Sequence, residues 1–201
     1  MSHLRTVIRN ANPSDRAVVI ETLTLSFARD PIIRFQFQDD STYETRAAAF
    51  FGHYFDVRLN GGDIYVADDG AGVSLWNPPG GNRLGNEFVE EDWRRNVLPS
   101  LEQEELLRYE SFKAVLDAMT PAEPHWYLGL LATRPDKQGA GVGRRLLEPM
   151  LHRAESETLP VFLETANPKN VEIYARFGFE VIADETVPDG PRVWGMLRPP
   201  Q

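Results

Sequence analysis

The chain has 201 residues, of which 42% are hydrophobic and 25% are charged, and it contains no cysteine. These values are typical of a globular protein, and the length predicts a single domain over residues 1–201. The absence of cysteine excludes disulfide frameworks, thiolate metal sites and a cysteine nucleophile, and we expect no bound metal.

The charge and hydropathy patterns exclude further classes of partner. The formal net charge is −9, which argues against non-specific binding to nucleic acid. No apolar run approaches the roughly 18 residues of a membrane-spanning helix, and the first residues lack a signal-peptide pattern. We therefore expect a cytoplasmic protein that binds neither nucleic acid nor membrane.

Residues 1–120 combine strand, helix and hairpin patterns. The sequence predicts strands at 6–9, 63–67 and 72–76, and helices at 13–29, 41–59 and 88–119, the last divided in two at Pro99. The helices follow from apolar residues that recur every three or four positions, with Leu107 among the expected buried positions. The two later strands flank an Asp-Asp-Gly turn, which predicts a hairpin.

Residues 121–201 alternate between strands and helices. The predicted strands are 126–133, 161–164, 179–182 and 192–196, and the predicted helices begin at 142 and 168, the second ending at Gly178. Some neighbouring strands form hairpins and others are separated by helices. The fold class is therefore α/β with a mixed sheet, not a purely parallel one.

A glycine-rich segment follows the apolar strand at 126–133. Gly139, Gly141 and Gly143 precede a helix whose first backbone N–H groups lack partners within the helix, and the helix dipole adds partial positive charge there. Because glycine lets a phosphate approach the backbone closely, this segment predicts an anion site. A tight turn without a ligand is the alternative.

Basic residues gather around this segment. They are Arg134, Lys137, Arg144 and Arg145. On an acidic chain, such a local basic spot suggests one anionic ligand rather than a polyanion. A solvated start of a helix explains any single one of these residues equally well.

Two nucleotide-binding motifs fit the segment poorly. A Walker P-loop ends in Gly-Lys-Ser/Thr, whereas two arginines follow Gly143 here. A Rossmann fingerprint shares the spacing of Gly139 and Gly141, and Glu164 ends a strand where a ribose-binding acid belongs. Its third glycine position is Arg144, however, and only 37 residues follow Glu164, too few to complete a doubly wound sheet.

The glycine-rich segment instead resembles motif A of the GNAT acetyltransferase superfamily. That motif reads Gln/Arg-x-x-Gly-x-Gly/Ala, and the chain has Gln138, Gly141 and Gly143 at these places. A second block, from Asn170 to Phe179, resembles the family's Asn…Tyr…Gly-Phe segment in the matching order and separation. Residues 23–31 and 126–128 also resemble the branch typified by puromycin N-acetyltransferase.

The resemblance implies a sheet whose two central strands part so that the pantetheine arm of acetyl-CoA lies between them. Residues 1–120 then form the acceptor side, and residues 121–201 form the acetyl-CoA-binding core. The residues that the resemblance places against acetyl-CoA are Leu131, Ala132, Thr133, Gln138, Gly139, Ala140, Gly141, Val142, Gly143, Arg144, Asn170 and Tyr174.

The resemblance also implies an N-acetyltransferase that moves the acetyl group directly to a primary amine in a ternary complex. Tyr174 corresponds to the family's tyrosine that protonates the departing thiolate, although a purely core tyrosine is the alternative. Glu164 and His125 are candidates for the general base, and Asp30 is a candidate for binding a cationic substrate. For these three residues a solvated or hydrogen-bonded structural role is the alternative.

The sequence does not identify the acceptor. We expect a small-molecule amine, with the helix at 41–59 and the helical stretch at 88–119 forming the wall of its site. The acids of that wall suit a cationic amine, or they form a solvated face; they are Glu90, Glu91, Asp92, Glu102, Glu104 and Glu105. An amine on a protein or peptide, or a non-catalytic acyl-CoA sensor, is the alternative, and the chain is expected to be a monomer or a homodimer.

Overall fold

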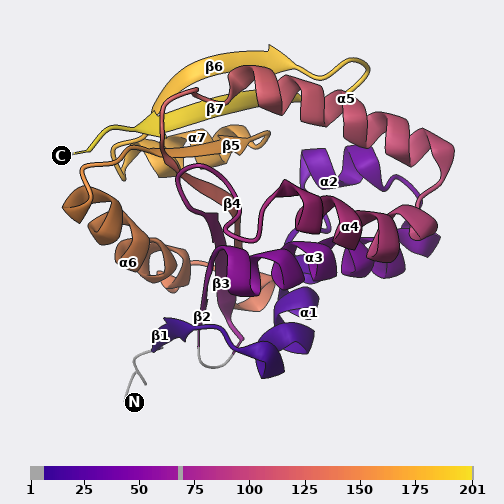
Figure 1. Ribbon diagram of the computed structural model, residues 1–201, viewed down its shortest axis with the longest axis horizontal. Helices are drawn as coiled ribbons and strands as arrows, with labels where there is room; N and C mark the ends of the chain where they lie inside the picture. Colours follow the sequence, from indigo (N-terminus) through magenta and orange to yellow (C-terminus); the bar gives the residue numbers. More distant parts are fainter. Residues whose placement is uncertain (1–6, 68–69, 201) are drawn as a thin grey trace.

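Residues 7–67 and 70–200, which the computed structural model describes, form a seven-stranded mixed sheet with helices on both faces (Figure 1). The strand order is β1-β2-β3-β4-β5-β7-β6. The strands are β1 (Ile8–Asn10), β2 (Asp63–Ala67), β3 (Gly72–Asn77), β4 (Trp126–Thr133), β5 (Val161–Thr165), β6 (Glu180–Thr186) and β7 (Arg192–Arg198). β4 and β5 are parallel and the other neighbours are antiparallel, which confirms the predicted mixed sheet. The predicted first strand began at Thr6, which lies outside the described residues.

The helices largely follow the predicted pattern. They are α1 (Arg16–Ser26), α2 (Pro31–Gln36), α3 (Asp40–Gly61), α4 (Asn86–Asn96), α5 (Gln103–Met119), α6 (Val142–Ser156) and α7 (Pro168–Ala175). None of these described helices is both long enough and apolar enough to cross a membrane. After α7, Gly178 adopts a φ of +83°, as its predicted role as a helix terminator requires.

α2 was not predicted, because Asp30-Pro31 looked like the end of the preceding helix. In the structure Asp30 is the N-cap of α2, and its Oδ1 accepts the backbone N–H groups of Ile32 and Ile33 at 2.9 and 3.1 Å. Pro31 occupies the first turn, where a helix needs no backbone N–H. The preceding helix α1 ends earlier, at Ser26, so these two residues begin a helix rather than end one.

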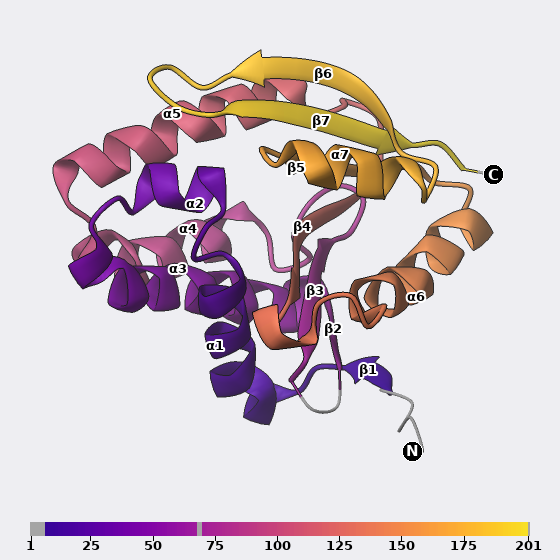
Figure 2. The same ribbon diagram turned by 180° about the vertical axis from the view of Figure 1, so that it is seen from behind.

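Helices enclose the sheet from two sides (Figures 1 and 2). On one face Leu23 of α1 and Phe51 of α3 belong to one buried cluster with Val73 and Leu75 of β3. On the other face α6 contributes Leu147, Met150, Leu151 and Ala154 to a cluster with Trp76, Trp126 and Val161. α5 runs beside the β6–β7 hairpin, where Phe112 and Met119 pack with Val187 and Val193.

The sheet opens between β4 and β5. These strands pair at Trp126 with Val161 and at Tyr127 with Phe162, although β4 continues to Thr133. β3 pairs with β4 on the other side as far as Thr133. Beyond Tyr127 the edge of β4 that faces β5 therefore has no strand partner, so its backbone groups are available to a ligand, although the carbonyl oxygen of Thr133 accepts a hydrogen bond from Nε2 of Gln138 at 3.3 Å. The parted strands implied by the family resemblance are confirmed.

β4 has one residue more than β3 at this opening. Leu75 is paired with Leu130 and Trp76 with Leu128, so Gly129 forms a β-bulge. A Cβ atom on Gly129 would lie 2.8 Å from Nη2 of Arg58. Glycine at the bulge therefore lets the Arg58 guanidinium of α3 approach the strand backbone.

Phe51 allows a test of this core. Its ring is fully buried, with centroid distances of 5.5 Å to Phe27 and 5.6 Å to Phe50. We expect Phe51→Ala to lower the free energy of unfolding by about 3–5 kcal/mol, because apolar contacts are lost and a cavity remains. Chemical denaturation measures the change.

Leu107→Ala is the control. The prediction that Leu107 is buried was wrong: it is 54% exposed, since α5 buries the face that carries Phe112 and Met119 instead. We expect a change of about 0.5 kcal/mol or less. A loss as large as that of Phe51→Ala would contradict the assignment of the core to the α3 face.

Candidate active site

A pocket lies where β4 and β5 part. Its lining comes from α2, α3, α5, α7, β4 and β5. The apolar lining residues include Phe27, Ile32, Ile33, Phe50, Phe112, Leu116, Leu128, Leu130 and Leu131. The polar ones are Asp30, Gln36, Tyr54, Tyr127, Glu164, Thr165, Asn170 and Tyr174. A mostly apolar wall with a few convergent polar groups is the usual form of a small-molecule site.

Glu164, near the end of β5, is one of the two acids that line this pocket. Its Oε1 accepts a hydrogen bond from the Tyr127 hydroxyl at 2.9 Å, and its Oε2 is buried without a hydrogen-bond partner among the described residues. Burial raises the pKa of Glu164 to about 7, while the hydrogen bond from Tyr127 and the charge of Arg58 oppose the shift. The carboxyl group can therefore exchange a proton near neutral pH.

Tyr174 and Asn170 reach the same pocket from α7. Tyr174 is buried, and its ring packs edge-on against Phe179 at 5.7 Å. Burial, with the nearby charges of Glu164 and Asp30, raises the pKa of Tyr174, so its hydroxyl keeps its proton. Asn170 donates a hydrogen bond from Nδ2 to Oγ1 of Thr165 at 3.3 Å. The structure thus brings together Tyr174, Asn170 and Glu164, which the sequence analysis singled out separately.

Asp30 also lines the pocket. Its Oδ1 is already engaged by the first N–H groups of α2, and burial raises the pKa of its carboxyl group. Asp30 therefore has a structural role as the N-cap of α2. Because it also lines the pocket, binding of a cationic substrate by Asp30 stays a prediction.

Arg58 of α3 lies behind the same wall. Its side chain is 4% exposed, its guanidinium carbon is 4.7 Å from the centroid of the Tyr54 ring, and its Nη2 lies against Gly129. Nε of Arg58 has no hydrogen-bond partner in the described part of the chain. Burial lowers the pKa of the Arg58 guanidinium, but arginine remains charged at neutral pH.

The glycine-rich loop forms the start of α6. Gly141 is the N-cap residue with a φ of +75°, and Gly139 has a φ of +80°. A Cβ atom on either residue would meet no atom within 4 Å, so the loop surface is open. A Cβ atom on Gly143 would lie 3.6 Å from Oγ1 of Thr133, which puts the start of α6 beside the end of β4. The predicted anion site therefore lies at the end of the open strand edge.

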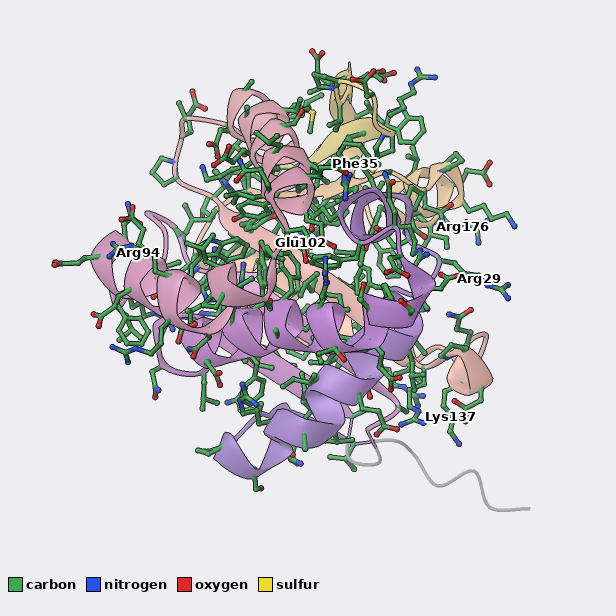
Figure 3. All side chains as sticks on the ribbon, turned by 90° about the vertical axis from the view of Figure 1, so that its right-hand side faces the viewer. Arg29, Phe35, Arg94, Glu102, Lys137 and Arg176 are labelled. Atoms are coloured by element: carbon green, nitrogen blue, oxygen red, sulfur yellow. The ribbon has the colours of Figure 1, made fainter. Side chains whose placement is uncertain are left out.

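Positive side chains surround this side of the molecule. Figure 3 shows Arg29, Lys137 and Arg176 pointing outward on the same side, and all three are exposed. Of the predicted basic spot, Arg144 binds Glu148 and Arg134 lies 3.6 Å from both Glu21 and Asp136, so these two are partly neutralised. Lys137 in turn lies 3.9 Å from Asp136.

His125 is not brought into the pocket. Its Nδ1 lies 2.7 Å from the carbonyl oxygen of Glu123, and its ring packs edge-on against Phe162. The acids of α4 and α5 are also occupied: Glu91 binds Arg95, Asp92 binds His53, and Glu105 binds Arg46. These contacts favour the structural alternatives that the sequence left open. Among the described residues, no group of three or more His, Asp and Glu side chains is arranged to hold a metal ion.

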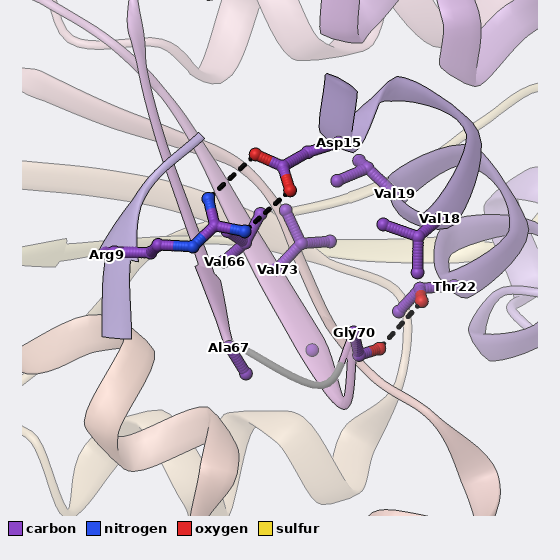
Figure 4. A pocket seen from close by; sticks show the side chains of 10 residues that line it. Arg9, Asp15, Val18, Val19, Thr22, Val66, Ala67, Gly70 and Val73 are labelled. Carbon is purple, nitrogen blue, oxygen red and sulfur yellow. Dashed lines mark hydrogen bonds and ion pairs between the residues drawn. The ribbon is translucent and has the colours of Figure 1, made fainter. Parts of the chain in front are cut away.

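A second hollow lies beside α1, β2 and β3 (Figure 4). Arg9 binds Asp15 through two N···O contacts of 2.7 and 2.8 Å, and Thr22 donates a hydrogen bond to the carbonyl oxygen of Gly70 at 2.9 Å. Most of the remaining wall is valine and alanine. None of its described lining side chains has a buried polar atom without a partner, in contrast to the pocket between β4 and β5.

Sequence reasoning missed three contributors to the site. Gly129 was read as part of a regular strand, and Tyr127 was not connected to Glu164, because both depend on how β4 pairs. Arg58 could have been identified from the sequence, because it falls on the apolar face of its helix, four residues after Tyr54 and three after Phe55. A charged residue at a core position of an amphipathic helix indicates a buried polar site.

The chain resembles known acetyltransferases in sequence. The profile of the acetyltransferase (GNAT) domain matches residues 82–198, more than half of the 201 residues. The uncharacterized N-acetyltransferase C550.08 of Schizosaccharomyces pombe is 27% identical over 167 residues, which span 79% of this chain and 68% of that protein.

Solved structures share the fold. A histone acetyltransferase HPA2 and related acetyltransferase from Corynebacterium glutamicum has a TM-score of 0.71 and 24% identity, covering 98% of each chain. Arylalkylamine N-acetyltransferase 2 from Aedes aegypti has a TM-score of 0.63 and 16% identity, covering 98% of this chain and 100% of that one. The narrower resemblance to the puromycin branch stays a prediction. With the parted strands and the domain match together, the chain belongs to the GNAT acetyltransferase family and is an N-acetyltransferase.

Proposed function

We propose that the protein transfers the acetyl group of acetyl-CoA directly to the primary amine of a small molecule bound between β4 and β5. The observation that carries this proposal is that Glu164 and Tyr174 line one largely apolar pocket at the open edge of β4. One side chain there is suited to remove a proton from an amine, and the other to supply a proton to a leaving group.

The chain offers a fitting site for acetyl-CoA. The backbone groups of Leu131 and Thr133, which face the open edge, suit the amides of the pantetheine arm, whereas those of Ala132 face β3; Asn170 lines the same pocket. The free N–H groups at the start of α6, from Gln138 to Arg144, suit the pyrophosphate. When bound, acetyl-CoA supplies the acetyl group as a reactive thioester.

Glu164 acts as the general base. An amine attacks only when neutral, so a group must accept the proton of the incoming ammonium. The carboxylate of Glu164 has an unpartnered oxygen in the pocket and a pKa of about 7, close to the value that suits a base at neutral pH. His125 lies outside the pocket lining, so we assign it no part in this step.

Tyr174 acts as the general acid. Attack by the amine breaks the carbon–sulfur bond, and the hydroxyl of Tyr174 donates a proton to the departing sulfur. The second proton that leaves the nitrogen restores the tyrosine. The net products are an N-acetyl amide, CoA with a protonated thiol, and one proton released through Glu164.

A small acceptor suits the enclosure of the pocket. Apolar side chains of α2, α3 and α5 form its outer wall, among them Ile33, Phe50 and Phe112. α3 and α5 were expected to form this wall, whereas α4 contributes no residue to the described lining. Such a wall encloses an amine with an apolar body more readily than it admits a folded protein.

Binding of acetyl-CoA tests the first half of the proposal. A site with an affinity of about 10 μM, saturated at about 1 mM, stabilises the folded protein by roughly 2.7 kcal/mol. For a chain of this size this corresponds to a thermal shift of several degrees. We expect the shift with acetyl-CoA and none with NAD.

Gly141→Ala is expected to weaken acetyl-CoA binding about tenfold or more, because a methyl group intrudes where phosphate meets the backbone. Gly80→Ala is the matched control, since Gly80 has a similar φ of +83° and equally open surroundings. If both variants bind acetyl-CoA like the parent protein, the α6 start is not the phosphate site.

The pH dependence tests the base. Because the carboxylate form is active, we expect kcat/KM to rise with pH through an apparent pKa of about 7. Glu164→Gln should lower kcat/KM about 100- to 10,000-fold and abolish this limb. Tyr127→Phe removes a hydrogen bond that stabilises the carboxylate, so the limb should move to higher pH. A limb that stays at the same pH in Tyr127→Phe would exclude Glu164 as its origin.

Tyr174→Phe tests the acid and separates an enzyme from a sensor. We expect turnover to fall about 100-fold or more while the affinity for acetyl-CoA is retained, because only the proton donor is lost. Tyr65→Phe is the control, since Tyr65 lies on β2 and does not line the pocket. Released CoA can be followed with thiol reagents, as the chain has no cysteine of its own. Absence of turnover with every amine, despite acetyl-CoA binding, would favour a sensor.

A further inference from the structure

We infer that the acceptor amine also carries a carboxylate, which Arg58 binds, and that the substrate class is amino acids with apolar side chains and their close analogues. This inference rests on the proposed amine acetylation and names the acceptor of the same site. Three polar groups around the pocket carry it.

Arg58 is the first of these groups. Its guanidinium is almost completely buried, yet Nε has no hydrogen-bond partner among the described residues, and its charge is only partly compensated, by the nearby carboxyl group of Glu164 and by the ring of Tyr54. An unpaired buried charge is strongly unfavourable, so a protein that keeps one has a use for it. The guanidinium lies against Tyr54 and Gly129, which both line the pocket, so Arg58 lies directly behind the pocket wall.

Glu164 and Gln36 complete the set. Oε2 of Glu164 is buried without a partner, and so are both Nε2 and Oε1 of Gln36, whose side chain is 1% exposed. Both residues line the pocket. The site therefore offers a fixed cation, a carboxylate and an amide, and each keeps at least one buried polar atom without a hydrogen-bond partner in the described protein.

A zwitterion complements these groups. Its ammonium suits Glu164, which takes the proton in the proposed reaction, and its carboxylate suits the fixed fork of Arg58 donors. The apolar wall, which includes Phe27, Ile33 and Phe112, suits an apolar side chain. An amine without the carboxylate leaves Arg58 buried and unpaired. Sites built around buried polar groups reject analogues that lack the matching group much more strongly than apolar pockets do.

The test compares amines in matched pairs that differ by the carboxylate. We would measure kcat/KM with acetyl-CoA for phenylalanine against phenethylamine and for leucine against 3-methylbutylamine. The parent protein should favour the amino acid by about 10- to 100-fold, the size expected for hydrogen bonds to a charged group. Arg58→Met should remove this preference, chiefly by raising KM for the amino acids, and Arg58→Lys should restore part of it.

Arg198→Met is the matched control. Arg198 is 5% exposed and equally buried, but it is engaged by Glu155 and by the carbonyl oxygen of Phe177, away from the pocket. This variant should lose stability and keep the preference for the amino acid. Gln36→Leu provides a second substitution in the pocket, and it should weaken binding of the amino acid with less effect on the amine.

Binding of N-acetylphenylalanine in the presence of CoA gives a readout that does not need turnover. Calorimetry should detect binding to the parent protein and at least about tenfold weaker binding to Arg58→Met. The inference is overturned if the amines without a carboxylate are acetylated as well as the amino acids, or if Arg58→Met slows both members of a pair equally. It is also overturned if N-acetylphenylalanine does not bind. Acetylation of any amine in the panel still supports the proposed function, so the two failures are distinguishable.

Discussion

The separation of β4 from β5 is the feature on which the site depends. Two residue pairs hold the strands together at one end, and beyond Tyr127 the facing edge of β4 has no strand partner. Unpaired backbone groups inside a protein are unfavourable unless something satisfies them. The opening is stable because the rest of the sheet and two helix layers support it: β3 pairs with β4 along its other edge, while α3 and α6 cover opposite faces.

The same opening sets the electrostatics of the pocket. Side chains from α2, α3 and α5 line one side with aliphatic and aromatic groups, so a charge placed there is poorly solvated. Burial raises the pKa of Glu164, and the Tyr127 hydrogen bond and the Arg58 charge limit the rise. The result, a carboxyl group that titrates near neutral pH, comes from the balance of burial against two neighbours on different elements, Tyr127 of β4 and Arg58 of α3.

Some of the buried polar atoms without a partner lie around the pocket, and others, on Thr24, Ser26, Asn77 and Arg145, lie elsewhere among the described residues. Arg58, Gln36 and Glu164 each keep a buried polar atom without a partner, and all three lie at or behind one wall. In the hollow beside α1, by contrast, Arg9 and Asp15 satisfy each other. A structure optimised for stability alone would pair or remove such groups, and their presence in one pocket wall supports the proposal that a ligand binds there.

The amino-acid sequence by itself determined most of the local structure and the family. Apolar periodicity located the helices, and three glycines after an apolar strand predicted an anion site at the start of a helix, because these features depend on neighbours in the chain. It also selected Glu164, Tyr174 and Asn170 as separate candidates. α2 escaped prediction because Asp30-Pro31 suits the end of one helix as well as the start of the next.

The tertiary structure decided which candidates meet. Glu164 and Tyr127 come from strands that pair at only two positions, and Arg58 approaches the site from α3, which lies well before both strands in the chain, across a bulge at Gly129. His125 was a candidate base alongside Glu164 in the sequence. It comes just before Trp126, the first paired residue of β4, and does not line the pocket. The distances between side chains on different elements, and the burial that raises the pKa of Glu164, depend on contacts between residues far apart in the chain. They are therefore set only when the tertiary structure forms.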